Sequence, residues 1–146
     1  MLPQFNWLAI IVAGLIPSVM GAIYYGPIFQ KQWLSSLGKT QEEMVPKNMG
    51  LTYGLALMMA MLLSINMKLT IEMIHRDVIN GQLAFHSTHT FGHGAFHGLL
   101  MCLFIIVPVI VSLSLFQKNS GKNILLNVVF WCITMSIMGA ILDGWN

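Results

Sequence analysis

The stretch His86-Ser-Thr-His89-Thr-Phe-Gly-His93-Gly-Ala-Phe-His97-Gly98 runs directly into the apolar segment Leu99 to Phe116. Four of the five histidines of the chain lie in it. At about 100° of rotation per residue, positions 86, 89, 93 and 97 fall within an arc of roughly 80°, so a helix would carry them as one stripe about 16 Å long. The pattern predicts a helix that enters a membrane with one polar, histidine-bearing face.

The composition excludes most soluble folds. The chain has 146 residues, of which 56% are hydrophobic and 8% charged, whereas soluble domains are about 25% charged. Four windows, approximately residues 6–26, 48–67, 94–116 and 124–142, are long and apolar enough to cross roughly 30 Å of hydrocarbon. The sequence therefore predicts an all-α polytopic membrane protein, a single domain over residues 1–146 folded as a bundle of four transmembrane helices.

The connection at residues 68–92 is polar but keeps a helical period. Leu69, Met73 and Val78 recur at helical spacing, which predicts that the second helix extends into water or continues as an interfacial amphipathic piece. Asn80-Gly81 is expected to end it. The third loop, residues 117–123, is so short that the third and fourth helices are predicted to be antiparallel neighbours.

Lysine distribution predicts the orientation. With four spans, both termini and the 68–92 connection share one side of the membrane, and the first and third loops share the other. The second side carries five basic residues and the first side two: Lys31, Lys39, Lys47, Lys118 and Lys122 against Lys68 and Arg76. The positive-inside rule then places both termini outside. A net charge of +2 is too small to indicate a nucleic-acid partner.

Small residues mark the faces where helices are expected to approach closely, because packing rather than exclusion from water drives helix association in lipid. The candidates are Gly14, Gly50, Gly54, Gly94 and Gly98. Some would serve contacts within the bundle and others contacts between copies, so the bilayer and a homo-oligomer or larger membrane complex are the expected partners. Cys102 and Cys132 lie in apolar surroundings and are interpreted as small buried hydrophobes.

Several ordered motifs support a resemblance to a known family. They are Asn6-Trp7-Leu8-Ala9, Tyr25-Gly26-Pro27 followed by Trp33 and Glu42-Glu43, Phe91-Gly-His93-Gly-Ala-Phe-His97-Gly98, and Met138-Gly-Ala-Ile141 followed by Trp145. In this order and spacing the chain resembles domain-of-unknown-function family 1761, small bacterial membrane proteins. The resemblance implies four membrane helices in the inner (cytoplasmic) membrane of a bacterial cell and assigns no reaction. His86, His89 and Asp143 depart from the family pattern.

Polar residues from all four helices are predicted to converge at the end that holds the termini. An expected polar cluster comprises Asn6, Asn66, Glu72 and His86. Ionisable residues at membrane depth are costly unless they are paired or face water, so they indicate a site. His93 and His97 are one helical turn apart, a spacing that can chelate a divalent metal such as Zn²⁺, with His89 or Asp143 completing the shell.

Three readings of the histidines stay open, namely hydrogen bonding between helices, metal binding, and proton or ion relay near neutral pH. The His93-x-x-x-His97 pattern lacks the glutamate of a zinc protease helix, and no nucleophile with a base, phosphate loop or cofactor fingerprint is evident. We therefore expect no enzyme activity. The favoured function is an oligomeric or accessory membrane subunit, with a metal-binding membrane protein and a small oligomeric transporter or channel as alternatives.

Overall fold

The computed structural model describes residues 5–74, 76–79, 82–85 and 89–145. In this part of the chain, four helical stretches are long and apolar enough to cross a membrane: Trp7–Ile28, Met49–Ile74, Phe91–Phe116 and Gly121–Gly144. They coincide with the four predicted spans, although the second reaches Ile74 instead of ending near Met67. The predicted fold class, an all-α bundle of four helices capable of spanning a membrane, is confirmed.

The first span ends in a wider turn and then a surface helix. Helix α1 (Trp7–Ile23) passes into the π-helical segment η1 (Tyr24–Ile28), which contains Pro27, a residue without a backbone donor. Helix α2 (Gln30–Leu37) ends at Gly38, whose φ of 64° is a left-handed conformation that glycine adopts without strain.

The loop continues through the 3-10 turn η2 (Glu42–Met44). The Thr40 amide donates to Glu43 Oε2 at 2.7 Å, and this bond holds the pKa of Glu43 below its ordinary value. The Glu43 carboxylate thus satisfies the backbone amide of Thr40, three residues earlier, as in a capping box.

Helix α3 (Met49–Ile74) confirms the predicted extension of the second helix, but the extension stops at Ile74. Strands β1 (Arg76–Ile79) and β2 (Gln82–Phe85) follow as an antiparallel hairpin in which Ile79 pairs with Gln82. The prediction that Val78 continues the helical period is therefore wrong. The Asn-Gly dipeptide between the strands is a typical hairpin-turn sequence, and this local preference outweighs a weak helical pattern. Its own residues, 80 and 81, lie outside the described part.

The third span consists of three segments, α4 (Phe91–Met101), the π-helical η3 (Cys102–Ile106) and α5 (Val107–Phe116). The wider π turn comes directly before Val107 and Pro108, where the missing proline donor interrupts the regular ladder of hydrogen bonds. Helix α6 (Gly121–Gly144) begins after Ser120, whose hydroxyl accepts from the Asn123 amide at 3.2 Å.

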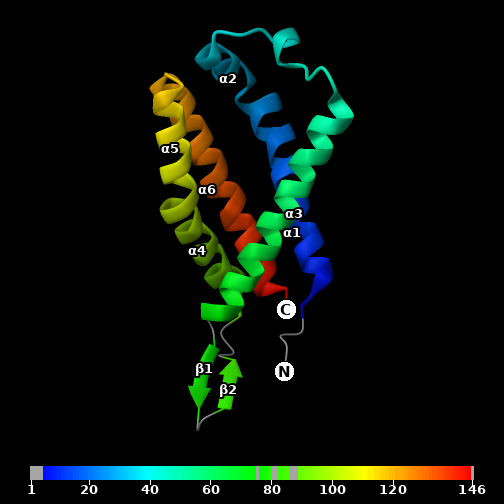
Figure 1. The fold of residues 1–146 in the computed structure, drawn as a ribbon, viewed down its shortest axis with the longest axis vertical. Coiled ribbons are helices and arrows are strands. Elements are labelled where there is room, and N and C mark those ends of the chain that lie inside the picture. Colours follow the sequence, from blue (N-terminus) through cyan, green and yellow to red (C-terminus); the bar gives the residue numbers. More distant parts are fainter. Residues whose placement is uncertain (1–4, 75, 80–81, 86–88, 146) are drawn as a thin grey trace.

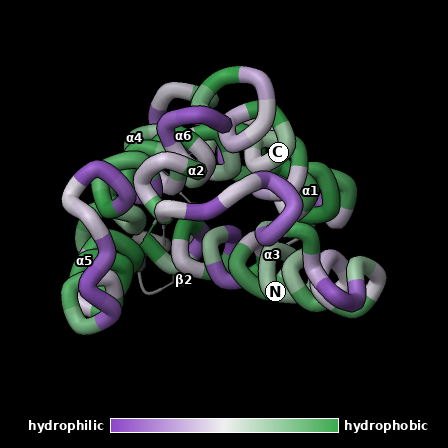
Figure 2. Tube along the Cα trace, turned by 90° about the horizontal axis from the view of Figure 1, so that it is seen from above, coloured by the Kyte–Doolittle hydropathy of each residue, from purple (hydrophilic) through white to green (hydrophobic). Residues whose placement is uncertain are grey.

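Figure 1 shows both chain ends and the hairpin at one end of the bundle, and α2 with η2 at the other end. This is the distribution of loops that the sequence predicts for four spans. Figure 2, which views the bundle along its length, shows hydrophobic residues along the helices and hydrophilic residues gathered in the connecting loops. The end with the chain ends is called the terminal end below, and the opposite end the loop end.

The core is apolar and rich in sulfur. It contains Ile10, Ala13, Met67, Ile71, Met101, Cys102, Met135, Met138 and Leu142. The Sγ atoms of Cys102 and Cys132 lie 3.6 Å apart, and both cysteines are free. Large apolar side chains such as Phe104 and Phe116 are exposed on the outside, which is the surface expected to face lipid tails.

Candidate functional site

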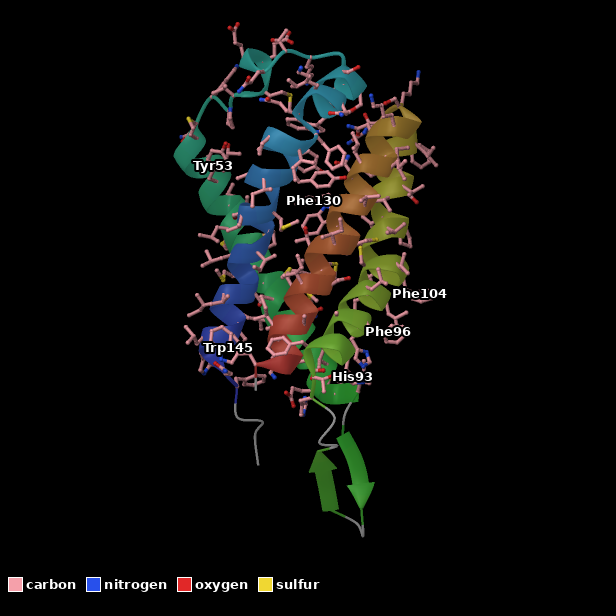
Figure 3. All side chains as sticks on the ribbon, turned by 180° about the vertical axis from the view of Figure 1, so that it is seen from behind. Tyr53, His93, Phe96, Phe104, Phe130 and Trp145 are labelled. Atoms are coloured by element: carbon pink, nitrogen blue, oxygen red, sulfur yellow. The ribbon has the colours of Figure 1, made fainter. Side chains whose placement is uncertain are left out.

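The candidate site lies at the terminal end, where α4 begins and α6 ends. Figure 3 shows His93 and Trp145 at this same end of the bundle. Helix α4 begins after Thr90, whose extended backbone and side-chain oxygen cap the helix by accepting from the His93 amide at 3.2 Å. The cap places His93 in the first turn of α4 and His97 one turn later.

Glycines bring α4 and α6 into direct backbone contact. A Cβ atom on Gly94 or on Gly98 would overlap the carbonyl oxygen of Gly139 or of Met135, respectively. Gly139 in turn has no room for a Cβ beside the Gly94 carbonyl. The predicted close approach at Gly94 and Gly98 therefore takes place within the bundle, and Gly139 is its partner on α6. Because of this contact, the face of α4 that bears His93 and His97 lies next to the last turn of α6.

Three histidines and one carboxylate form a hydrogen-bonded chain, called the Asp143 cluster below. Asp143 is fully buried. Its Oδ1 lies 2.6 Å from His89 Nδ1 and its Oδ2 lies 3.0 Å from His93 Nδ1. The chain continues from His93 Nε2 to His97 Nε2 at 3.2 Å. The rings of His93 and His97 meet edge to face, with centroids 4.5 Å apart.

The hydrogen-bond inventory of the Asp143 cluster permits two protonation states. An ionised carboxylate only accepts, so Nδ1 of both His89 and His93 carries a hydrogen when Asp143 is charged. The bond between His93 and His97 then needs one proton between two nitrogens, which is satisfied with both rings neutral or with one ring cationic. Both states keep the three hydrogen bonds of the Asp143 cluster.

A buried ion pair lies beside the Asp143 cluster. Lys68 Nζ is 2.7 Å from Glu72 Oε1 and donates to the Leu142 carbonyl at 3.0 Å. Lys68 is fully buried and Glu72 is 5% exposed. The Leu142 carbonyl belongs to the last turn of α6, where a cation is favoured by the helix dipole. The lysine thus joins α3 to the same turn of α6 that carries Asp143.

The sequence reasoning missed Lys68 as a site residue because its charge was assigned to a water-exposed extension of the helix. A signal was available. Lys68 and Glu72 are four residues apart within an apolar helix, and a charged pair at that spacing inside a spanning segment indicates burial with mutual neutralisation.

The structure brings together some of the predicted site residues and separates others. His89, His93, His97 and Asp143 meet, and Glu72 lies beside them through Lys68. Asn6 is at the same end but caps α1 and donates to the Trp145 carbonyl at 2.9 Å. Asn66 is exposed and joins no such network in the described part. His86 lies outside the described residues.

The single helical stripe of histidines is also only partly formed. His93 and His97 lie on α4, whereas His89 precedes the Thr90 cap and reaches Asp143 from the chain before the helix. The stripe prediction is wrong for His89 because the threonine cap starts the helix later than the spacing of the histidines implies.

The zinc-like shell of His89, His93, His97 and Asp143 stays a prediction. Both ring nitrogens of His93 are engaged, Nδ1 with Asp143 and Nε2 with His97. Within the residues that the structure describes, no group of three or more histidine, cysteine, aspartate or glutamate side chains is arranged to hold a metal ion.

Comparison with known families gives one match. The sequence model described as "Protein of unknown function (DUF1761)" matches residues 8–143. The search of curated proteins found no match, and neither did the search of solved structures.

Proposed function

Because this chain belongs to the DUF1761 family, whose description names no activity, we propose its function from the site: it is a small membrane subunit that takes up and releases a proton at the Asp143 cluster. The observation that carries the proposal is a fully buried carboxylate held by two histidine Nδ1 atoms, at 2.6 and 3.0 Å, with a third histidine behind one of them.

The hydrogen bonds of Asp143 support proton exchange at defined atoms. An ionised Asp143 accepts from Nδ1 of His89 and from Nδ1 of His93, which fixes the tautomer of both rings. Histidine is the side chain whose charge changes near neutral pH. The proton would therefore be gained or lost at the remaining ring nitrogens of the Asp143 cluster.

The position of the cluster supports a role as an accessory subunit that responds to pH. Asp143 bonds to the chain immediately before α4 through His89 and to α4 itself through His93. A change of protonation therefore acts on the contact between α4 and α6 and on the segment that connects to the hairpin. We propose that partner subunits, or further copies of the chain, sense this end, which the lysine count places outside the inner membrane.

Transport by a single copy is less well supported. The Asp143 cluster and the polar groups near Tyr25 and Asn127 are separated by the apolar core of Met67, Met101 and Met135, among others. A path for ions through one chain would have to cross this core. We also propose that the protein is not an enzyme, since the sequence carries no recognisable nucleophile and base or cofactor motif.

The test is a titration of histidine protonation in lipid nanodiscs. With ¹⁵N-labelled histidine, the ring nitrogens report tautomer and charge. We expect the parent to carry its hydrogen at Nδ1 of His89 and His93 and to gain a proton within the His93 and His97 pair on acidification. Asp143→Asn keeps the shape but removes the carboxylate that accepts from both Nδ1 atoms, so this uptake should change or disappear.

Glu42→Gln is the matched control, because it removes an exposed carboxylate from η2, at the opposite end of the bundle. It should titrate like the parent. Identical uptake by the parent and Asp143→Asn would contradict the proposal. A parallel titration of chelator-treated protein with Zn²⁺ tests the alternative hypothesis of metal binding. That hypothesis requires tight Zn²⁺ binding by the parent and its loss in a His93→Ala, His97→Ala double variant.

A further inference from the structure

A large cavity lies at the loop end, far from the Asp143 cluster. Its volume is about 780 Å³, within the usual range of ligand pockets. Residues of α1, α3 and α6 line it, together with residues of η1, of α2 and of the loop that carries η2. In Figure 3, Tyr53 of α3 and Phe130 of α6, both among the lining residues, lie on two sides of this region.

The cavity exists because α1 and α3 are in contact only along part of their length. Near the terminal end, Gly14 packs against Met61 and the Ser64 hydroxyl donates to the Ile10 carbonyl at 2.7 Å. Figure 1 shows that the two helices cross and then separate toward the loop end. The cavity is open on one side, so an amphiphile of the membrane can enter it between the two helices.

The walls of the cavity belong mainly to membrane-spanning segments, and this location indicates what kind of molecule can occupy it. The α3 lining extends from Met49 to Leu63, about 21 Å of helix. Pro17 and Leu63, at the inner end of the lining, are apolar, and the lining residues include no charged side chain. The surroundings of these segments are lipid tails, so the occupant enters from the bilayer and is uncharged where it is bound.

The loop end of the cavity is different in chemistry. There the lining includes the side-chain amides of Gln30 and Gln41 and the indole of Trp33, which are hydrogen-bond donors. The Tyr25 ring lies 5.0 Å from Trp33 and 4.9 Å from Phe130, centroid to centroid. The Tyr25 hydroxyl donates to Asn127 Oδ1 at 2.6 Å, which fixes the ring.

We propose that this cavity binds one uncharged, single-chain amphiphile of the membrane, with its hydrocarbon chain between α1 and α3 and a planar, carbonyl-bearing head against the ring cluster of Tyr25, Trp33 and Phe130. This is the chemistry of an isoprenoid quinone. The aromatic side chains supply faces for a flat ring, and the amide and indole donors match carbonyl oxygens. A phospholipid headgroup finds no cation among the lining residues.

The four tryptophans of the chain allow a direct test. Trp33 and Trp131 line the cavity, whereas Trp7 and Trp145 lie at the terminal end near Asn6. A quinone ring quenches indole fluorescence on contact. Two full-length variants, Trp7→Phe with Trp145→Phe and Trp33→Phe with Trp131→Phe, are reconstituted in nanodiscs and titrated with a short-chain ubiquinone analogue. We expect saturable quenching only where Trp33 and Trp131 remain.

Substitutions that fill the cavity provide the second part of the test. Ala56→Phe, on the α3 wall, should weaken the saturable quenching about tenfold or more. Leu55→Phe adds bulk to an exposed neighbouring position that is not among the lining residues, and should leave it unchanged. If Ala56→Phe does not fold by circular dichroism, Ala22→Phe on the α1 wall gives the same readout.

Three results would overturn the proposal. Equal quenching of the two tryptophan pairs would show that the analogue is only dissolved in the bilayer. An unchanged affinity in a folded cavity-filling variant would place the analogue elsewhere. Quenching of Trp33 and Trp131 by a brominated phospholipid that the analogue does not displace would show that an ordinary lipid chain fills the space.

Discussion

The contact between α4 and α6 makes a sharp prediction for Gly94→Ala. A Cβ atom on Gly94 would lie 2.5 Å from Asp143 Cβ, whereas two carbon atoms in contact need about 3.5 Å. Helix α4 must therefore move away from α6 by about 1 Å. The distance from His93 Nδ1 to Asp143 Oδ2, now 3.0 Å, would then grow to about 4 Å, beyond hydrogen-bonding range.

The expected cost of this single methyl group is about 1–3 kcal/mol of unfolding free energy, as for overpacked cores in general. The assay is reversible unfolding in mixed micelles, combined with the histidine ¹⁵N spectrum. Gly54→Ala is the matched control, because nothing lies within 4 Å of a Cβ at that position of α3. It should be neutral or slightly stabilising, since alanine favours a helix over glycine.

Parental stability together with an unchanged His93 spectrum in Gly94→Ala would refute the reasoning. It would mean that the backbones of α4 and α6 are not in direct contact at Gly94. Loss of stability with an unchanged spectrum would contradict only the link between the glycine contact and the Asp143 cluster.

Three further outcomes are expected. Lys68→Ala should cost about 3–5 kcal/mol in the same unfolding assay because it leaves Glu72 buried without its cation, while Lys68→Met combined with Glu72→Leu should recover most of this loss. Gly54→Leu should change the oligomeric mass in detergent without loss of folding, since the position is open on the outside of α3; an unchanged mass would remove this face as a contact between copies. In a cysteine-free background, a cysteine at Asn80 should react with an impermeant thiol reagent on intact cells and one at Lys39 should not, and the reverse labelling would invert the proposed orientation.

The sequence predicts the fold well because hydrocarbon imposes few alternatives. A backbone that crosses lipid must satisfy its polar groups internally, so long apolar windows become helices. Gly94 and Gly98 also predict a close contact between helices, because small residues in a membrane helix allow the backbone of another helix to approach. The hairpin was not predicted, because its four-residue strands lie in a polar connection where helical and extended patterns compete.

The site is less predictable because it depends on which helix faces meet. The sequence places His93, His97 and Asp143 at one end, and the structure confirms that their side chains are together. Nothing in the spacing indicates that Asp143 Oδ2 bonds to His93 Nδ1. Lys68 escaped notice because burial of its charge depends on the Leu142 carbonyl of a distant helix.

The Asp143 cluster also has a consequence for biogenesis. Its hydrogen bonds connect positions 50 and 54 residues apart, from the approach to α4 to the last turn of α6. Until that final turn has left the ribosome and α6 has inserted, His89 and His93 lack their carboxylate. Helices can cross the bilayer one after another during synthesis, but the site is assembled only after α6 has been made. A chain stalled before Asp143 would carry all of the histidines and lack the acceptor that organises them.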